Sequence, residues 1–587
     1  MTNPPPSTSP EDLAPCNLMR RLGITATLVL VLALIGLGLW GAGDLLVLPA
    51  FALVVFLWVV GLLVVVARRL FIDVVMPAGT VLAHLGAVGW EALAGDEEGR
   101  RVRELADRAA RRLELVRPAL AWLGDRIRPG HGGLRRTVAA TTAFAGSIAL
   151  YKLAALVGDE TSVVVATDIR IANLAHRIDE PGLRAVMLGL TSAGRTAIMT
   201  VIIVVLVASA LLARARRPAV LILAVTATSA LGVTILKAVA GRERPGIGSL
   251  VETSASWPSG HASAGLALGL AVTVGWWAAN RKRWPVVAAA VIPVGLLIGY
   301  SRAYLTVHWA SDVLGGWLVA LTATGLVLVA DDIFLARSPS RSRLPARALS
   351  IAGVLAAVIF SGAAYQGHAT QLPAPVEPIP IEVATLDPAV AASSFGPFSE
   401  TLTGRQIEPV GLIIAVSEEG LLAAVEQAGW SVADLPTVRR LIGVYTAGLR
   451  KRDDLTAPVT PTFFEGRMQD IAIEKPVDAS AGSVAERHHA RLWRLPVVLD
   501  NGCPVWVATA SLDDRVEWSL RTVLPNHHID PAIDTEQAYL VADLVGTGRL
   551  ESTGMSRVTE PVMGTNAAGN PWFTSGTATI LVHPTGC

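Results

Sequence analysis

The sequence predicts an all-α polytopic membrane protein followed by a soluble α+β domain. Of the 587 residues, 52% are hydrophobic and only 17% are charged, which is far from the balance of a soluble globular protein. The long apolar runs end near residue 365, and a stretch of ordinary soluble character follows. The 49 Lys and Arg residues nearly balance the 48 Asp and Glu residues, so no basic excess indicates a nucleic-acid partner.

About nine apolar runs are long enough to cross a bilayer, whose hydrocarbon core of about 30 Å requires about 20 residues of helix. Arg20 and Arg21 precede the first run, as in a signal peptide. That run is long and lacks a clear cleavage site, so we expect it to be retained. The predicted spans are 22–40, 45–67, 137–156, 196–213, 218–238, 261–278, 285–300, 310–330 and 348–365.

The arginines and lysines of the short loops predict the orientation, because cytoplasmic loops carry an excess of both. When the spans are threaded in order, these basic residues fall on one side, which is therefore predicted to be cytoplasmic. They are Arg20, Arg21, Arg68, Arg69, Arg214, Arg216, Arg217, Arg281, Lys282, Arg283, Arg337, Arg341, Arg343 and Arg347. The exoplasmic side then receives 159–195, 241–260, 301–309 and everything after 366.

Four segments follow from this threading. Residues 1–136 comprise a cytoplasmic tail, two spans and a basic amphipathic segment, and residues 137–332 form a six-span domain. Residues 333–366 add another span, and residues 367–587 comprise a linker and the soluble carboxy-terminal domain. Apolar residues between 99 and 136 recur at helical spacing, which predicts an amphipathic helix. This helix would either lie on anionic headgroups or pack against neighbouring cytoplasmic loops.

The carboxy-terminal domain is predicted to mix strands and helices. Residues 410–416 and 504–510 are short apolar runs typical of strands. Residues 418–428 are expected to form a helix that Gly429 ends. These elements favour an α+β domain.

Two sets of side chains in this domain are candidates for cross-linking or metal binding. Cys503 and Cys587 are both predicted to be exoplasmic, so a disulfide between them is permitted, whereas Cys16 is predicted to be cytoplasmic. A second set could ligate a metal, but adjacent histidines on a strand or turn point in different directions, so we expect surface or packing roles. This set is His488, His489, His527, His528, Asp530 and Asp534.

Three short exoplasmic segments carry polar residues that are costly at the ends of membrane spans unless they are used. They are KAVAGRERP at 237–245, PSGH at 258–261 and SRAYLTVHWASD at 301–312. Lys237, Arg244 and Arg302 supply three cations, which suit the oxygens of a phosphate. The second segment opens an apolar helix, so its backbone N–H groups would point at the same anion.

The third segment adds a nucleophile. His308 and Asp312 are four residues apart, on one face of a helix, so the carboxylate can hold one imidazole nitrogen as N–H and leave the other free to attack. His261 is then placed to protonate a leaving oxygen. No metal ligand is left over, so no cofactor is expected. Taken singly, Lys237 and Arg302 could be snorkelling anchors, and the other residues could have structural roles. Three loops that deliver compatible groups to the same side of the membrane favour a functional site instead.

The three strings resemble the signature of the type 2 phosphatidic acid phosphatase superfamily: Lys, six residues, Arg-Pro; Pro-Ser-Gly-His; and Ser-Arg, five residues, His, three residues, Asp. The resemblance covers 137–332 and implies a metal-independent phosphatase without a cofactor. It implies that His308 attacks phosphorus, that Asp312 orients His308 and that His261 protonates the leaving alkoxide. The phosphoryl oxygens would be bound by Lys237, Arg244, Ser259, Gly260 and Arg302.

The carboxy-terminal strings FEGRMQDIAIEKP, ERHHARLWRLP and PNHHIDPAIDTEQAYL resemble the LssY-type carboxy-terminal domain. That domain is found attached to membrane phosphatases of this kind. Three roles stay open for this domain: regulation of the phosphatase, recognition of an envelope partner, or docking on the membrane.

A lipid phosphate suits loops at the outer membrane surface that are flanked by Trp257 and Trp309, because tryptophan favours the headgroup interface. Phosphatidic acid, phosphatidylglycerol phosphate and a polyprenyl pyrophosphate are all candidates, because generic apolar surfaces would hold the chain of each. A phosphotransferase that passes the phosphoryl group to an envelope lipid or sugar stays open. A non-catalytic membrane protein is disfavoured by the intact signature.

Overall fold

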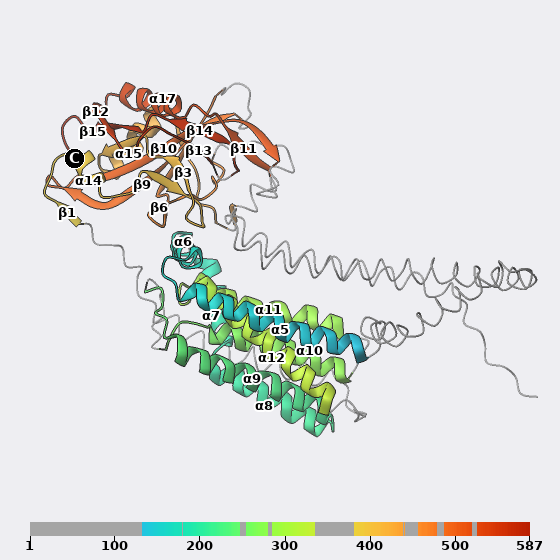
Figure 1. The fold of residues 1–587 in the computed structure, drawn as a ribbon. Helices are drawn as coiled ribbons and strands as arrows, with labels where there is room; N and C mark the ends of the chain where they lie inside the picture. Colours follow the sequence, from blue (N-terminus) through green and yellow to red (C-terminus); the bar gives the residue numbers. More distant parts are fainter. Residues whose placement is uncertain are drawn as a thin grey trace, which may run out of the picture. The chain divides into compact units, whose positions relative to one another are not determined.

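The structure, a computed structural model, describes most of the chain after residue 131, which Figure 1 draws in colour. The predicted spans 22–40, 45–67 and 348–365, most of the amphipathic segment and Cys16 lie outside the described residues. The described residues are 132–178, 180–246, 254–279, 284–334, 381–437, 439–440, 456–477, 486–518, 525–566 and 568–587.

The chain divides into two compact units, which are described separately. The described part of the smaller unit holds residues 132–149 of helix α5 (Gly132–Val157) and residues 321–334 of helix α12 (Ala310–Phe334). Arg135 pairs with Asp331 and Arg136 pairs with Asp332, so two ion pairs join the start of α5 to the end of α12. Both carboxylates are buried, and each therefore needs its cation.

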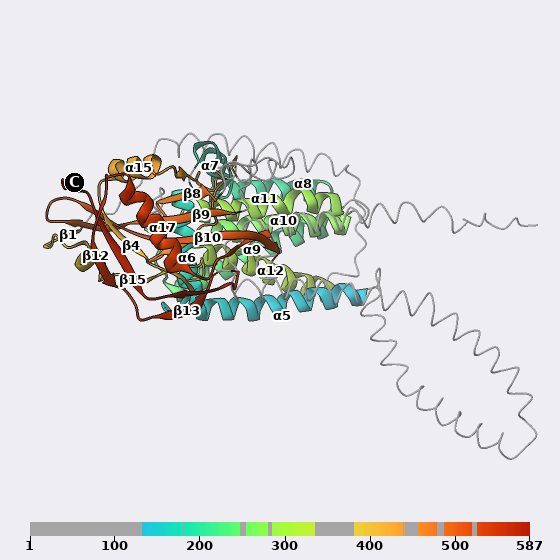
Figure 2. The same ribbon diagram turned by 90° about the horizontal axis from the view of Figure 1, so that it is seen from above.

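The larger unit contains the helices that position the polar segments. Helix α10 lies between α9 and α11, and α8 lies against α9 (Figures 1 and 2). A Cβ atom at Gly295 of α11 would lie 2.4 Å from the carbonyl oxygen of Gly265 in α10, so these two helices approach at a distance that only glycine permits. The helices are α6 (Val163–Arg177), α7 (Pro181–Ala193), α8 (Thr196–Leu212), α9 (Arg216–Ala240), α10 (Gly260–Ala279) and α11 (Trp284–Tyr304).

Among the described helices, 4 are long and apolar enough to cross a membrane, or up to 5 if α7 and α8, which are bent by 57° at their junction, form one span. The four coincide with the predicted spans 137–156, 218–238, 285–300 and 310–330. The predicted spans 196–213 and 261–278 fall on α8 and α10. A helical membrane domain is therefore confirmed, whereas nine spans and their orientation stay predictions.

The segment 159–195, predicted only to connect two spans, contains two helices. Ser162 caps α6 by accepting a hydrogen bond from the Val165 backbone N–H, and Pro181 opens α7 with a preset backbone angle. These helices have 15 and 13 residues, so neither gives the long apolar run by which spans were found. Helix α6 proves to be part of the site.

Helix α6 also contacts the carboxy-terminal part of the same compact unit. Arg170 Nη2 lies 2.5 Å from Glu400 Oε2, and Asn173 donates to the carbonyl oxygen of Gly466 at 2.9 Å. Apolar side chains of α6 and of the following turn pack against a buried cluster of that part. The side chains involved are Ile171, Leu174, Ile178, Leu402, Phe463 and Met468.

The carboxy-terminal domain is built on a 9-stranded sheet with the strand order β12-β15-β4-β10-β9-β8-β5, in which β1 also pairs with β9 and β11 with β10. A 4-stranded sheet, β3-β2-β6-β7, and the pair β13-β14 accompany it. The strands are β1 (Ile381–Val383), β2 (Phe398–Glu400), β3 (Gln406–Pro409), β4 (Leu412–Ala415), β5 (Ser431–Val432), β6 (Phe463–Phe464), β7 (Arg467–Met468), β8 (Ile471–Pro476), β9 (Arg487–Leu499), β10 (Pro504–Trp518), β11 (Pro525–Ile529), β12 (Glu551–Arg557), β13 (Val562–Thr565), β14 (Pro571–Thr574) and β15 (Thr577–Val582).

Both faces of the large sheet are covered. Helices α15 (Glu418–Gln427) and α17 (Ile533–Gly546) pack on one face, and α14 (Pro388–Ala392) packs on the other. Strand β4 is therefore buried on both sides, which explains why its sequence is continuously apolar rather than alternating. The predicted strands 410–416 and 504–510 and the predicted helix 418–428 are confirmed by β4, β10 and α15.

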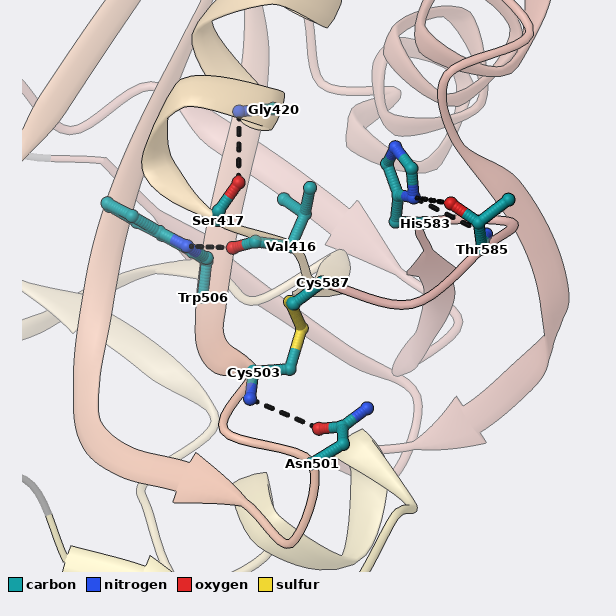
Figure 3. Close-up of a disulfide and its surroundings, with 9 residues drawn as sticks. All are labelled: Val416, Ser417, Gly420, Asn501, Cys503, Trp506, His583, Thr585 and Cys587. Atoms are coloured by element: carbon teal, nitrogen blue, oxygen red, sulfur yellow. Dashed lines mark hydrogen bonds between the residues drawn. A yellow bond between two sulfur atoms is a disulfide. The ribbon is translucent and has the colours of Figure 1, made fainter.

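The two carboxy-terminal cysteines are joined. Cys503, in the connection between β9 and β10, forms a disulfide with Cys587, and their Cα atoms are 5.4 Å apart (Figure 3). The bond ties the last residue of the sequence to the main sheet. It closes a long loop, since 84 positions separate the two cysteines.

Three of the histidines considered above as metal ligands pair with carboxylates of strand β10 and helix α17. His488 Nδ1 lies 2.8 Å from Glu536, and His528 Nδ1 lies 2.7 Å from Asp514. His489 lies 3.3 Å from Asp513. In the part of the chain that the structure describes, no three His, Cys, Asp or Glu side chains form a group that could hold a metal ion.

Candidate active site

His308 and Asp312 meet at the junction of α11 and α12. His308 Nδ1 lies 3.2 Å from Asp312 Oδ2, and both side chains are buried. An ionised carboxylate only accepts hydrogen bonds, so it holds the proton on Nδ1 and leaves the lone pair on Nε2. The prediction that both residues share a helix face is wrong in one respect, because α12 begins at Ala310 and His308 lies in the preceding turn. That turn is stabilised by the hydrogen bond of the His308 backbone N–H to the Arg302 carbonyl.

The charges of the three predicted cations act on this histidine. Burial and the positive charges of Arg302, Arg244 and Lys237 hold the pKa of His308 well below its ordinary value. Arg244 Nη1 lies 3.2 Å from His308 Nε2 and donates to the carbonyl oxygen of Val307 at 2.8 Å. The cations of two separate segments thus act on His308, and one of them, Arg244, lies next to the nitrogen that carries the lone pair.

Hydrogen bonds hold each cation in place. Lys237, in the last turn of α9, donates to the carbonyl oxygen of Ala255. Arg302, near the end of α11, is buried and donates to Thr191 Oγ1 of α7 at 2.8 Å. Because a buried cation needs charged or strongly polar partners, this arrangement suits an anionic ligand such as a phosphoryl group.

The PSGH segment folds back on α12, and this corrects one expectation. The backbone N–H of Ser259 donates to the carbonyl oxygen of Asp312 at 2.9 Å, so it does not point at an anion as predicted. A Cβ atom at Gly316 would lie 2.5 Å from the Ser259 carbonyl oxygen, so the close approach of the segment to α12 requires glycine there. The Ser259 hydroxyl oxygen accepts a hydrogen bond from the Ala262 backbone N–H at 3.5 Å, in the first turn of α10. Contacts of Ser259 and Gly260 with a phosphoryl group stay predictions.

His261 opens α10 beside the same cluster. It lies within electrostatic range of His308, Arg302 and Arg244. Gly194, which ends α7, makes room for it, because a Cβ atom there would lie 2.7 Å from His261 Cδ2. The two imidazoles therefore belong to one site.

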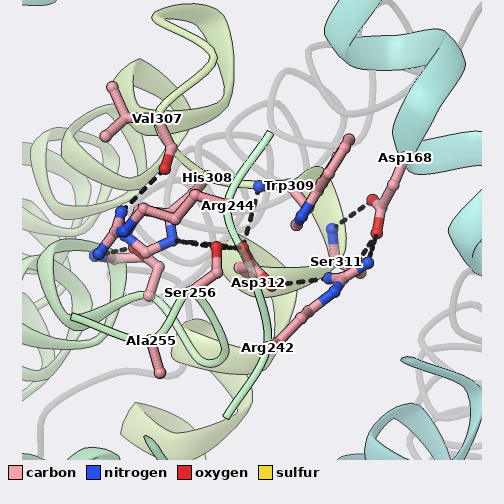
Figure 4. A network of polar contacts seen from close by, with 12 residues as sticks. Asp168, Arg242, Arg244, Ala255, Ser256, Val307, His308, Trp309, Ser311 and Asp312 are labelled. Carbon is pink, nitrogen blue, oxygen red and sulfur yellow. Dashed lines mark hydrogen bonds and ion pairs between the residues drawn. The ribbon is translucent and has the colours of Figure 1, made fainter. Parts of the chain in front are cut away.

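Three further side chains join the site without belonging to the signature (Figure 4). Ser256 donates to Asp312 Oδ2 and lies 3.3 Å from His308 Nδ1. Arg242 and Asp168 lie on the other side of Asp312. Sequence reasoning missed all three. The available signals were the first arginine in GRERP, a serine two residues before PSGH, and an acidic residue in the segment 159–195.

Known proteins resemble the two parts of the chain. The PAP2 superfamily model matches residues 218–332, and the model described as the LssY C-terminus matches residues 391–577. Over 193 residues the chain is 31% identical to phosphatidylglycerophosphatase B of Bacillus subtilis (strain 168). This match covers 32% of this chain and 94% of that protein. The chain belongs to the PAP2 superfamily.

A solved structure of this superfamily is also similar. It is the crystal structure of the first transmembrane PAP2 type phosphatidylglycerolphosphate phosphatase from Bacillus subtilis, with 29% sequence identity and a TM-score of 0.32. The match covers 34% of this chain and 100% of that chain.

Membership in the PAP2 superfamily confirms the resemblance seen in the sequence. The protein is a membrane lipid phosphatase related to phosphatidylglycerophosphatase, and it carries an LssY C-terminal domain. All eight residues to which the resemblance assigns a role fall within the matched residues 218–332. Asp168 lies outside that segment.

Proposed function

We propose that this PAP2 enzyme hydrolyses a lipid phosphate or pyrophosphate at the outer face of the membrane through a phosphohistidine intermediate. The observation that carries the proposal is the buried His308–Asp312 pair, whose free nitrogen lies 3.2 Å from Arg244 Nη1 and whose imidazole also feels the charges of Arg302 and Lys237. Such a nitrogen is neutral, and the cations can bind the three non-bridging oxygens of a phosphoryl group.

In the first step, His308 Nε2 attacks phosphorus and the bond from phosphorus to the lipid oxygen breaks. His261 gives its proton to that oxygen, so the lipid leaves as an alcohol, or as a lipid monophosphate if the substrate is a pyrophosphate. Asp312 stabilises the positive charge that the His308 ring gains on phosphorylation. Lys237, Arg244 and Arg302 bind the phosphoryl oxygens, with Ser259 and Gly260.

In the second step, a water molecule attacks phosphorus and the bond from phosphorus to His308 Nε2 breaks. His261, now neutral, takes a proton from this water, so inorganic phosphate leaves and both histidines return to their starting states. The step needs no metal or cofactor, because the charges are supplied by side chains. Phosphatidylglycerol phosphate is the first substrate to test, given the relative's printed name, followed by phosphatidic acid and a polyprenyl pyrophosphate.

Two features support the outer face. Disulfides persist in oxidising compartments outside the cytoplasm, and the carboxy-terminal domain contains the Cys503–Cys587 bond. Helix α6 contacts both that domain, through Arg170, and the site, through Asp168. In this proposal the site and the carboxy-terminal domain therefore lie on the same face of the membrane. The phosphatase domain comprises residues 137–332, and residues 367–587 comprise the linker and the carboxy-terminal domain.

The test is phosphate release by purified protein from these three lipids in detergent, measured with and without EDTA. We expect release from at least one lipid, and its loss in His308→Ala, since the covalent route is then closed. His583→Ala, which removes a histidine of the carboxy-terminal domain, should keep the wild-type rate. Full activity in His308→Ala, or a loss with EDTA that zinc or magnesium restores, would contradict the mechanism.

The shared face is tested by the same assay in sealed proteoliposomes. Added protease cuts only those molecules whose carboxy-terminal domain faces outward. We expect these same molecules to be the ones that hydrolyse lipid supplied from outside. Hydrolysis of external lipid by molecules whose carboxy-terminal domain is protected would place the site on the opposite face.

A further inference from the structure

Arg242 forms the centre of a charged cluster beside the catalytic carboxylate. Its Nη1 donates to Asp312 Oδ1 at 2.7 Å and to Ser311 Oγ at 2.8 Å, and its Nη2 donates to Asp168 Oδ2 at 2.9 Å (Figure 4). The guanidinium also lies over the ring of Trp309, with Cζ 5.4 Å from the ring centroid. One planar fork thus joins two carboxylates that come from different helices.

The two oxygens of Asp312 are used by different partners. Oδ2 accepts from His308, from Ser256 and from the backbone N–H of Trp309. Oδ1 accepts from Arg242. Because Asp312 is fully buried, its orientation toward His308 depends on these contacts, and Arg242 supplies the only charged one on Oδ1 among the described residues.

Asp168 binds Arg242 on the side of the guanidinium that does not contact Asp312. This carboxylate is 2% exposed and comes from α6, outside the segment matched by the PAP2 model. Its Oδ1 accepts the backbone N–H of Ser311 at 2.9 Å, which is one of the N–H groups left without a helical partner in the first turn of α12. Its Oδ2 accepts from Arg242 and from the Ser311 hydroxyl. Asp168 therefore holds both the arginine and the helix start that carries Asp312.

The chain turns so that two arginines of one motif serve different partners. Gly241 ends α9 with a φ of 59°, a left-handed conformation that favours glycine. Arg242 follows directly and contacts Asp312, whereas Arg244 contacts His308 Nε2. Arg242 thus acts on the Asp312 carboxylate, and Arg244, only two positions later, is placed to bind phosphate.

We infer that Arg242 and Asp168 are positioning residues of the phosphatase: Arg242 holds Asp312 ionised and oriented toward His308 Nδ1, and Asp168 holds Arg242. The inference rests on the proposed function. Without Arg242, the buried Asp312 charge is left uncompensated, so the carboxylate rotates or takes up a proton. Either change removes the hydrogen bond that keeps the proton on Nδ1 and the lone pair on Nε2.

The test compares steady-state kinetics of Arg242→Gln, Arg242→Lys, Asp168→Asn and the double variant Arg242→Gln/Asp168→Asn on one lipid phosphate. For Arg242→Gln we expect kcat to fall about 100-fold with KM nearly unchanged, because a misplaced catalytic group costs about this much and the phosphate ligands are intact. Arg242→Lys should restore little of the loss, because an ammonium group cannot bridge both carboxylates.

The double variant separates positioning from general stability. If Asp168 acts through Arg242, Asp168→Asn lowers kcat about tenfold in the wild type and has no further effect when Arg242 is already replaced. Thermal unfolding in detergent identifies variants that fail to fold. Arg170→Gln is the matched control, because it breaks another ion pair of α6, the one to Glu400, and should leave kcat unchanged.

Three outcomes would overturn the inference. They are a rise in KM with kcat unchanged in Arg242→Gln, additive effects of the two substitutions, and an equal loss of kcat in Arg170→Gln. Failure of the proposed function is distinguishable, because His308→Ala would then retain activity. If His308→Ala is inactive and Arg242→Gln is normal, only the positioning roles are wrong.

Discussion

At the scale of single residues, the titration of His308 follows from its surroundings. A histidine whose pKa is lowered stays neutral, and so nucleophilic, until the pH falls below the lowered value. Burial and the charges of Arg302, Arg244 and Lys237 lower this pKa from the ordinary value of 6.5, so the acid limb of phosphoenzyme formation is expected below pH 6.5.

Replacing Arg244 by Gln removes one of these cations, so the pKa of His308 should rise and the acid limb should move to higher pH. The measurement is kcat/KM against pH for one activated phosphate ester in the wild type and in Arg244→Gln. Titration of the substrate is common to both proteins and cancels in the comparison. A limb that stays in place, or that moves to lower pH, would show that the cation does not act on the nucleophile.

The residues found from the sequence are those whose spacing is fixed by the signature, such as Lys237 and His308. Ser256, Arg242 and Asp168 escaped, because nothing in their spacing shows that loops far apart in the chain bring them to Asp312. The backbone of Ser259 was assigned to the anion because it precedes a helix. The carbonyl oxygen of Asp312 takes that N–H instead, a contact that depends on tertiary packing.

At the scale of elements, the contact between α12 and the start of α10 positions both histidines. A Cβ atom at Gly316 would lie 2.5 Å from the Ser259 carbonyl oxygen and 3.0 Å from the Ala262 Cβ. Since both neighbours are close to the backbone, Gly316→Ala must displace the PSGH segment. We expect an overpacking cost of about 1–3 kcal/mol and a fall in kcat of about tenfold or more.

The matched control is Gly189→Ala in α7, where an added Cβ would meet nothing within 4 Å. That change should keep the activity and stabilise the protein by about 0.5–1 kcal/mol, because alanine favours a helix over glycine. Thermal unfolding and phosphate release measured on both variants test this. Equal behaviour of Gly316→Ala and Gly189→Ala would mean that the α10–α12 contact does not position the site.

Elements with long apolar runs, such as α9 and α12, were predictable from length and hydropathy alone. Helices α6 and α7 were not, because each is short and lies outside such a run. Their positions depend on packing: α7 packs on α11, and α6 is fixed by Asp168 at the start of α12. Of the three site residues that sequence reasoning missed, Asp168 comes from α6, and Arg242 and Ser256 come from the connection between α9 and α10.

At the scale of the whole molecule, composition separated a helical membrane part from an α+β part, and the PAP2 and LssY matches agree with that division. The order of the large sheet was not predictable. Strand β15 pairs in parallel with β4, which lies more than 150 positions earlier in the chain, and β10 also pairs with β4. Long-range pairings of this kind leave no local signal in the sequence.

The central claim is that phosphate passes through His308 on its way from lipid to water. The most direct measurement is rapid quenching in base of the enzyme mixed with a lipid carrying a labelled phosphate, followed by location of the label, since phosphohistidine survives base. We predict label on His308 in the wild type and none in His308→Ala. Steady turnover by a wild-type enzyme that never carries the label on His308, or label retained in His308→Ala, would contradict the account.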